Sequence, residues 1–290
     1  MGVLFPVVIG ILMVGPPLTT AFTVLIVFGL SYEWLKLAHI QTKIEKRLFY
    51  GILLGSLGVF LVVGMKGAFA FLFGVAALVY YGMRSCKGKG RKKHLEIEKK
   101  NAVETRRENE IIETLENCPL QILEKSEHCG WFFLGLLYIG VPCLSFLGLY
   151  ERERGYTIVL WMLFMIWACD IGAYLIGSWL KGPKIAPRIS PKKTWSGFFG
   201  GFFCAEVAGV LSGEMFGFDS KNVFFLGLGV IVFAVLGDLL ESYLKRCQKI
   251  KDTGSFIPGH GGLFDRLDST LAVLPLVAFV LWITNGAFFK

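Results

Sequence analysis

Residues 237–268 organise this chain, and they read G-D-L-L-E-S-Y-L-K-R-C-Q-K-I-K-D-T-G-S-F-I-P-G-H-G-G-L-F-D-R-L-D. The stretch begins inside an apolar segment, yet it holds five acidic and five basic residues. Charges at the edge of a bilayer are costly, and they gather where a substrate or an ion compensates them. A basic loop that only connects two spans does not explain this number of acids, so the stretch is predicted to carry a functional site.

Helical spacing brings the first charged residues of this stretch together. Four polar residues fall at i, i+3, i+4 and i+7 and therefore share one helix face: Asp238, Glu241, Ser242 and Lys245. The helical pattern stops at Thr253, and a glycine-rich turn follows at 258–262. If the next helix starts near Leu263, two further carboxylates share a face: Asp265 and Asp268. Carboxylates, basic residues and flexible backbone together indicate a metal-assisted phosphate site.

The composition predicts a membrane protein. The chain has 290 residues, of which 54% are hydrophobic and only 18% are charged, whereas soluble domains are nearer a quarter charged. The apolar residues form blocks of roughly 20, long enough to span a bilayer. We expect an all-α integral membrane protein of about nine transmembrane helices with catalytic cytoplasmic loops. The predicted segments are 3–15, 19–37, 48–64, 67–83, 131–149, 157–177, 195–215, 222–241 and 269–289, of which the first is short enough to be a half-span.

The basic residues predict how the chain is oriented. If loops alternate between the two sides, one side holds 25 of the 30 Lys and Arg residues, and the positive-inside rule makes that side cytoplasmic. Its loops are 38–47, 84–130, 178–194 and 242–268. The net charge of +8 follows these loops, so we expect no nucleic-acid partner. The cell inner membrane is the expected location, with the site facing the cytoplasm.

Three parts of the chain differ in character. Residues 1–83 are predicted to form N-terminal membrane helices, 84–130 a charged cytoplasmic loop, and 131–290 C-terminal membrane helices with the catalytic motifs. Residues 95–116 of the loop lack Gly and Pro, which favours a solvated helix. The basic start of the loop either binds anionic lipid headgroups or simply follows the positive-inside bias, and the second interpretation is favoured.

Two features lie upstream of the charged stretch. Asp170 stands in an apolar segment, W-A-C-D-I-G-A-Y, and an ionisable group there is a functional candidate. The loop that follows is basic, and its prolines keep it non-helical until a helix starts near Trp195. Backbone amides at that helix start, together with Lys192, Lys193 and Thr194, suit a polyphosphate.

These motifs resemble a known family. The pattern Ser242-x-Leu244-Lys245-Arg246, four residues, Lys251-Asp252-x-Gly254, then Pro258-Gly259-His260-Gly261-Gly262-x-x-Asp265-Arg266-x-Asp268 is similar to the signature of phosphatidate cytidylyltransferases, the CDP-diacylglycerol synthases. The D-I-G-A-Y at Asp170 and the I-S-P-K-K-T-W-S-G at Ile189 also resemble that family, in the expected order. The resemblance covers roughly 157–290. One departure is Ser196, a position that is often acidic in the family.

The resemblance implies a reaction, a cofactor and partners. CTP and phosphatidate would give CDP-diacylglycerol and pyrophosphate by metal-assisted in-line displacement, without a covalent intermediate. The implied cofactor is Mg²⁺, with a second cation left open. The implied partners are CTP, phosphatidate, membrane lipids and a second copy of the chain in a homodimer. The chemistry fits the residues, because two anions must meet and both metal and basic groups must neutralise them.

The residue roles follow from this reaction. The predicted metal ligands are Asp238, Asp265 and Asp268. The predicted catalytic residues are Asp238, Asp265, Lys245, Ser242 and His260, of which His260 is as readily a structural turn residue. The predicted substrate-binding residues are Lys192, Lys193, Thr194, Arg246, Lys251, Gly259, Gly261, Gly262, Arg266 and Asp170.

Two other functions remain open. A CTP-dependent lipid kinase acting on a polyprenol-type alcohol would share the membrane spans, metal and CTP, but the full signature argues against it. An ion-coupled transporter would place Asp170, Asp238 and Asp265 around a coupling ion near the midplane. It is disfavoured because the charges crowd at one edge of the membrane and no inverted repeat is visible.

Overall fold

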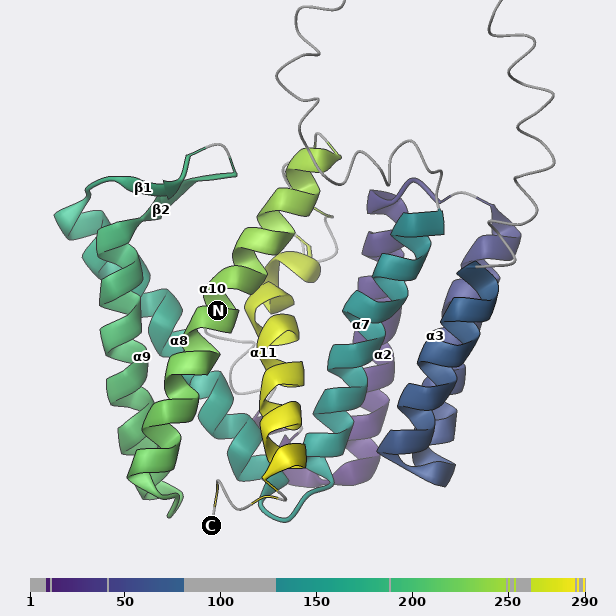
Figure 1. Ribbon diagram of the computed structural model, residues 1–290, viewed down its shortest axis with the longest axis horizontal. Helices are drawn as coiled ribbons and strands as arrows, with labels where there is room; N and C mark the ends of the chain where they lie inside the picture. The colour runs from purple at the N-terminus through teal and green to yellow at the C-terminus, as the bar shows by residue number, and fades with distance from the viewer. Residues whose placement is uncertain are drawn as a thin grey trace, which may run out of the picture.

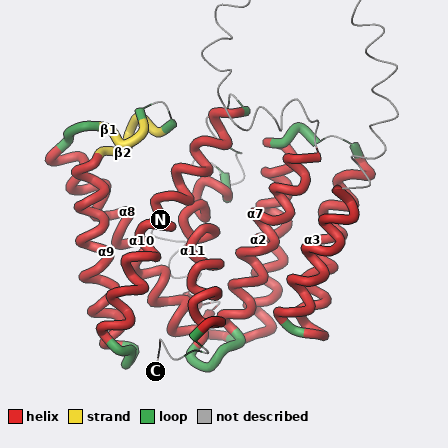
Figure 2. Tube along the Cα trace, viewed as in Figure 1, coloured by secondary structure: helices red, strands yellow, loops and turns green. Residues whose placement is uncertain are grey.

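The computed structural model describes residues 9–10, 12–40, 42–80, 129–187, 189–248, 250, 253, 262–284, 286 and 289. Within these ranges the chain is a bundle of long helices with one small β-hairpin, and this confirms the predicted all-α class (Figures 1 and 2). The elements are α2 (Pro16–Leu37), α3 (Lys43–Val63), α7 (Cys129–Tyr150), α8 (Gly155–Leu180), β1 (Lys184–Ala186), β2 (Ser190–Thr194), α9 (Trp195–Met215), α10 (Ser220–Cys247) and α11 (Phe264–Ile283).

Seven of the described helices are long and apolar enough to cross a membrane, and the apolar helix Met65–Tyr80 is shorter. The predicted count of nine is therefore not confirmed, and most of the predicted segment 3–15 lies outside the described residues. Large apolar side chains cover the outside of the bundle; Val62 is 85% exposed and Trp179 is 81% exposed. A lipid environment removes the cost of such surfaces. The protein is a multi-pass membrane protein.

Capping residues explain where the helices begin. Pro16 and Pro17 start α2, because proline is tolerated in the first helical turn. The Thr42 side chain accepts a hydrogen bond from the Glu45 N–H, so α3 begins five residues before the predicted segment 48–64. Thr194 caps α9 in the same way, and α9 starts at Trp195 as predicted.

The connections lie at two ends of the bundle. The hairpin and the C-terminal end of α10 are at one end, at the top of Figure 1, and the turns at 151–154 and 216–219 are at the other. The loops 178–194 and 242–268 thus start from the same side, as predicted. Which side faces the cytoplasm stays a prediction, as does the division into 1–83, 84–130 and 131–290.

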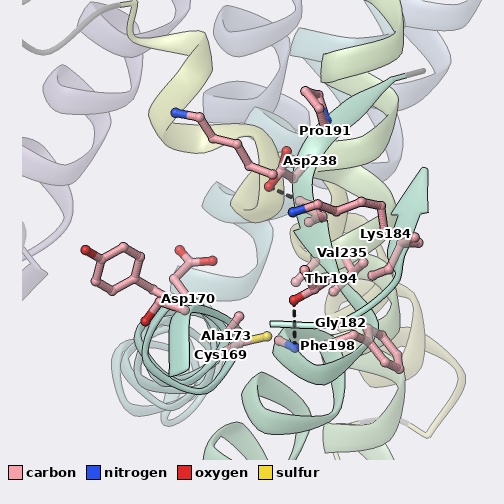
Figure 3. Close-up of a pocket in the computed structure, with 18 of the residues that line it drawn as sticks. Cys169, Asp170, Ala173, Gly182, Lys184, Pro191, Thr194, Phe198, Val235 and Asp238 are labelled. Carbon is pink, nitrogen blue, oxygen red and sulfur yellow. Dashed lines mark hydrogen bonds and ion pairs between the residues drawn. The ribbon is translucent and has the colours of Figure 1, made fainter. Parts of the chain in front are cut away.

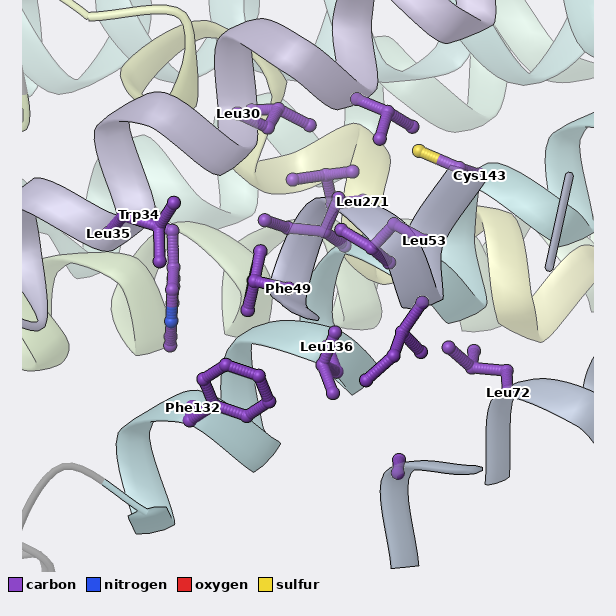
Figure 4. Close-up of a cluster of buried hydrophobic side chains, with 14 of the residues drawn as sticks. Leu30, Trp34, Leu35, Phe49, Leu53, Leu72, Phe132, Leu136, Cys143 and Leu271 are labelled. Atoms are coloured by element: carbon purple, nitrogen blue, oxygen red, sulfur yellow. The ribbon is translucent and has the colours of Figure 1, made fainter. Parts of the chain in front are cut away.

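Among the described residues, two hydrophobic clusters form the core. The first joins α2, α3, the helix Met65–Tyr80 and α7, and Figure 4 shows Trp34, Phe49 and Phe132 within it. The second joins α8, α9 and α10. Helix α11 contributes Leu271 to the first cluster and Leu274 to the second. It therefore connects the N-terminal helices with the helices that carry the motifs.

Helices α8 and α9 pack with their backbones close together, because glycines line the contact. A Cβ atom at Gly201 would lie 2.7 Å from the carbonyl oxygen of Cys169, and one at Gly197 would lie 2.9 Å from that of Ala173. Small residues permit this kind of approach between membrane helices. The packing fixes Asp170 on α8 relative to the start of α9.

We expect Gly201→Ala to destabilise the protein by about 1–3 kcal/mol, because the new methyl group would collide with main-chain atoms of α8. The measurement is the thermal unfolding midpoint in detergent. Gly58→Ala is the matched control, since a Cβ atom at Gly58 would meet nothing within 4 Å. Equal midpoints for the two variants would contradict the close packing of α8 on α9.

Candidate active site

One face of α10 carries the predicted polar residues. The Lys245 ammonium lies 2.8 Å from a Glu241 oxygen on the same helix and 2.7 Å from a carboxylate oxygen of Asp265 on α11. The Ser242 hydroxyl donates to Asp238 at 3.4 Å, one turn earlier. The helix reaches Cys247, so all four residues of the predicted face lie on it. Lys245 therefore joins α10 to α11 at the site.

Three carboxylates converge beside this ion pair. Oxygen atoms of Asp238, Glu241 and Asp268 lie within 4.8 Å of one another. Glu241 is 3% exposed, and its Oε1 atom has no hydrogen-bond partner among the described residues. The main-chain N–H of Ser269 donates to Asp268 at 2.7 Å. A set of closely spaced oxygen donors with an unpaired buried oxygen fits a hard divalent cation. We call these three residues the acidic cluster.

Asp265 is not a member of the acidic cluster, and both of its carboxylate oxygens have other partners. One accepts from Lys245, and the other accepts from the Gly262 N–H at 3.0 Å. The structure thus brings Glu241, which the sequence did not assign as a ligand, together with two of the predicted ligands. Asp265 as a direct metal ligand stays a prediction.

The β-hairpin attaches to this region from the side of α9. Strands β1 and β2 are antiparallel, with Lys184 opposite Thr194 and Ala186 opposite Ser190. The Lys193 ammonium on β2 lies 2.6 Å from Asp238. The sequence predicts non-helical backbone here but no hairpin. The ion pair links that hairpin to the acidic cluster.

Arg246 and Ser196 make further links around the hairpin. The Arg246 side chain donates to the carbonyl oxygen of Ile189 at 3.4 Å. The Ser196 hydroxyl donates to the carbonyl oxygen of Lys181, the residue that follows α8. The first contact holds the loop against α10, and the serine that departs from the family pattern joins the residue after α8 to the first turn of α9.

A cavity of about 740 Å³ opens beside the hairpin (Figure 3). Asp170 from α8 and Asp238 from α10 line it from different helices, and Lys192, Lys193 and Thr194 line it from β2. Apolar side chains form much of the rest of its wall. The structure therefore brings residues that the sequence assigned from three separate motifs to one region. Lys192 is exposed, and Lys193 is half-buried.

Other predicted residues lie elsewhere or outside the described part of the chain. Four of them are outside the described residues: Lys251, Gly259, His260 and Gly261. Arg266 is exposed on the first turn of α11. Gly262 is buried, and a Cβ atom there would lie 2.8 Å from a carboxylate oxygen of Glu33.

Glu33 is a residue that sequence reasoning missed. It lies on α2, is 1% exposed, and accepts hydrogen bonds from the main-chain N–H groups of Leu263 and Phe264, each at 2.8 Å. Its signal was available, because an ionisable residue inside an apolar segment is a functional candidate by default. The argument that singles out Asp170 applies equally to Glu33.

Comparisons with known proteins place the chain in a family. The model of the cytidylyltransferase family matches residues 1–284. The chain is 40% identical over 150 residues to a phosphatidate cytidylyltransferase of Brucella suis biovar 1, covering 51% of this chain and 56% of that protein. It is 38% identical over 151 residues to one of Staphylococcus aureus strain COL, covering 51% of this chain and 57% of that protein. The chain thus aligns with about half the length of these curated relatives. Because the family model spans nearly all of it, the chain belongs to the cytidylyltransferase family.

Proposed function

We propose that this protein transfers the cytidylyl group of CTP to phosphatidate, which gives CDP-diacylglycerol and pyrophosphate for phospholipid synthesis. Family membership and the names of the two relatives support the reaction class. The observation that carries the proposal is the acidic cluster, which contacts two lysine side chains and contributes Asp238 to the wall of a cavity in a membrane bundle. Such a region suits a charged nucleotide and an amphipathic acceptor.

The chemistry needs positioning and charge neutralisation rather than a covalent nucleophile. An oxygen of the phosphatidate phosphomonoester forms a bond to the α-phosphorus of CTP, and the bond from that phosphorus to the bridging oxygen of the β-phosphate breaks. Pyrophosphate leaves with the electron pair. Both reactants are anions, so the protein must first bring like charges together.

Mg²⁺ is the cofactor that the acidic cluster fits. Asp238, Glu241 and Asp268 would hold it, and the unpaired Oε1 atom of Glu241 supplies an oxygen that otherwise lacks a partner among the described residues. When bound, the ion neutralises phosphate charge and polarises phosphoryl oxygens. Asp265 accepts from Lys245 and from the Gly262 N–H, so in this arrangement it lies beside the ligands and not among them. A second cation remains part of the proposal.

The basic residues bind phosphates in this proposal. Lys193 now pairs with Asp238, and its ammonium would be available to the triphosphate when that carboxylate holds Mg²⁺. Lys192 and the capped start of α9 extend the same surface. Lys245 and Arg246 come from the last turn of α10 rather than from the hairpin, and they would bind the phosphatidate headgroup.

The lipid acceptor reaches the cavity from the bilayer. Tyr174 lines the cavity and is 75% exposed, and Phe198 adds a second aromatic wall. These apolar surfaces suit the glycerol end of the acyl chains while the phosphate meets the charges. The cytoplasmic face of the cell inner membrane and the homodimer belong to this proposal as well.

The reaction predicts pyrophosphate release that depends on three components. Purified protein in detergent receives CTP, phosphatidate and Mg²⁺, and pyrophosphate and lipid product are measured together. We expect equal amounts of pyrophosphate and CDP-lipid, and neither when phosphatidate or Mg²⁺ is omitted. CDP formed with a polyprenol-type alcohol would favour the lipid kinase instead, and no nucleotide chemistry with any acceptor would favour the transporter.

Asp265→Asn is expected to lower turnover by at least about 100-fold while the protein stays folded, because the amide no longer balances the Lys245 charge beside the acidic cluster. Turnover and the unfolding midpoint are measured for the same preparations. Asp219→Asn is the matched control: Asp219 caps α10 at its far end, and asparagine caps as well. Wild-type turnover in Asp265→Asn would remove this residue from the site.

Mn²⁺ binding tests the cation site without turnover. We expect Asp268→Asn to weaken Mn²⁺ binding by more than about tenfold, since it removes a charged oxygen donor from the acidic cluster. Free Mn²⁺ is titrated by electron paramagnetic resonance, again with Asp219→Asn as the control. Unchanged affinity in Asp268→Asn would refute the assignment of the cation to this cluster.

A further inference from the structure

Glu33 connects two parts of the chain that are far apart in sequence. Its carboxylate on α2 accepts the N–H groups of Leu263 and Phe264 at the start of α11, and the Thr253 hydroxyl donates to it at 3.4 Å. Glu33 and Thr253 are 1% and 3% exposed. These contacts join the N-terminal helices, which carry none of the motifs, to the helix that carries Asp265 and Asp268.

The contact replaces a helix cap. The first N–H groups of a helix have no partner within it, and a Ser, Thr, Asp or Asn side chain usually accepts from them. The residue at this position is Leu263, which makes no side-chain capping bond. Glu33 instead accepts from the N–H groups of Leu263 itself and of Phe264, the first residue of the helix, and its negative charge is favourable at the positive end of the helix dipole. These bonds also compensate for the burial of a charged group.

The first turn of α11 is held by a hydrogen bond at its own start and by contacts with α2 and α7. The N–H of Gly262 donates to Asp265, and the next two N–H groups donate to Glu33. The neighbouring Trp34 ring lies 5.7 Å from the ring of Phe264, which in turn stacks on Tyr138 of α7 at 5.4 Å. The turn is therefore fixed against α2 and α7 by hydrogen bonds and by aromatic packing.

We infer that Glu33 is a positioning residue for the proposed cytidylyl transfer: by holding the first turn of α11, it places Asp268 against Asp238 and Glu241. The inference rests on the proposed function. Asp268 lies one turn after Phe264, so a shift of the helix start would move its carboxylate relative to the two on α10. Glu33 is not a member of the acidic cluster.

Glu33→Gln tests this role because it keeps the size of the side chain. The amide offers one acceptor oxygen for two N–H groups and points its own NH₂ group at the other. We expect kcat to fall by about tenfold or more and the Mn²⁺ dissociation constant to rise by a similar factor. At saturating Mg²⁺, KM for CTP should stay within about twofold, because Lys192 and Lys193 lie on β2 and not on α11.

Glu206→Gln is the matched control. Glu206 is another buried glutamate in an apolar helix, but it lies on α9 and its oxygens have no hydrogen-bond partner among the described residues. We expect it to keep the wild-type kcat and Mn²⁺ affinity. If Glu33→Gln cannot be purified as a monodisperse protein, Thr253→Val removes the third donor to Glu33 and should shift both quantities in the same direction by about threefold.

The Mn²⁺ titration separates positioning from loss of fold. A role in folding alone would lower the number of Mn²⁺ sites per chain and leave their affinity unchanged, and that result would overturn the inference. Wild-type kcat and affinity in Glu33→Gln would overturn it too. Failure of the wild-type protein to bind Mn²⁺ and to release pyrophosphate would instead refute the proposed function, and the inference would fall with it.

Discussion

The site depends on the placement of three carboxylates that repel one another inside a membrane bundle. Asp238 and Glu241 lie on α10, Asp268 lies on α11, and their oxygens approach within 4.8 Å. In a medium of low dielectric constant such a group is unfavourable unless positive charge lies beside it. Two ammonium groups meet this need: Lys193 contacts Asp238, and Lys245 contacts Glu241. The helices can therefore pack without the cluster driving them apart.

Local spacing makes much of this region predictable. The face that carries Asp238, Glu241 and Lys245 follows from the helical period alone, and the start of α11 near Leu263 follows from the glycine-rich turn that precedes it. The start of α9 at Trp195 follows from the prolines before it. In each of these cases the deciding interaction lies within a few residues of the position that it fixes.

Contacts between distant residues are not predictable in the same way. Glu33 lies 230 residues before Leu263, and nothing in a single sequence says which helix start a buried carboxylate will cap. The hairpin escapes prediction because residues 190–194, S-P-K-K-T, show no alternation of apolar and polar residues, and Thr194 is their one β-branched residue. It is held by ion pairing and by its flanking helices, which are tertiary effects. The pairing of Lys245 with Asp265 is equally beyond the sequence, although both residues are recognisable in it.

The two lysines also explain how the acidic cluster could exist both with and without a bound cation. Lys193 and Lys245 supply the positive charge that the carboxylates require. A divalent cation in the acidic cluster would supply that charge itself, so the hold of the carboxylates on both ammonium groups would weaken. In the proposed reaction, the released ammonium groups would then be available to the phosphates of the nucleotide and the lipid. Cation binding and phosphate binding would favour each other. The phosphates would balance the ammonium groups that the cation displaces, and the cation would balance the carboxylates that the ammonium groups leave. In the proposed reaction, the hydrogen bonds that hold α11 on α2 would keep the carboxylates in place while their partners change.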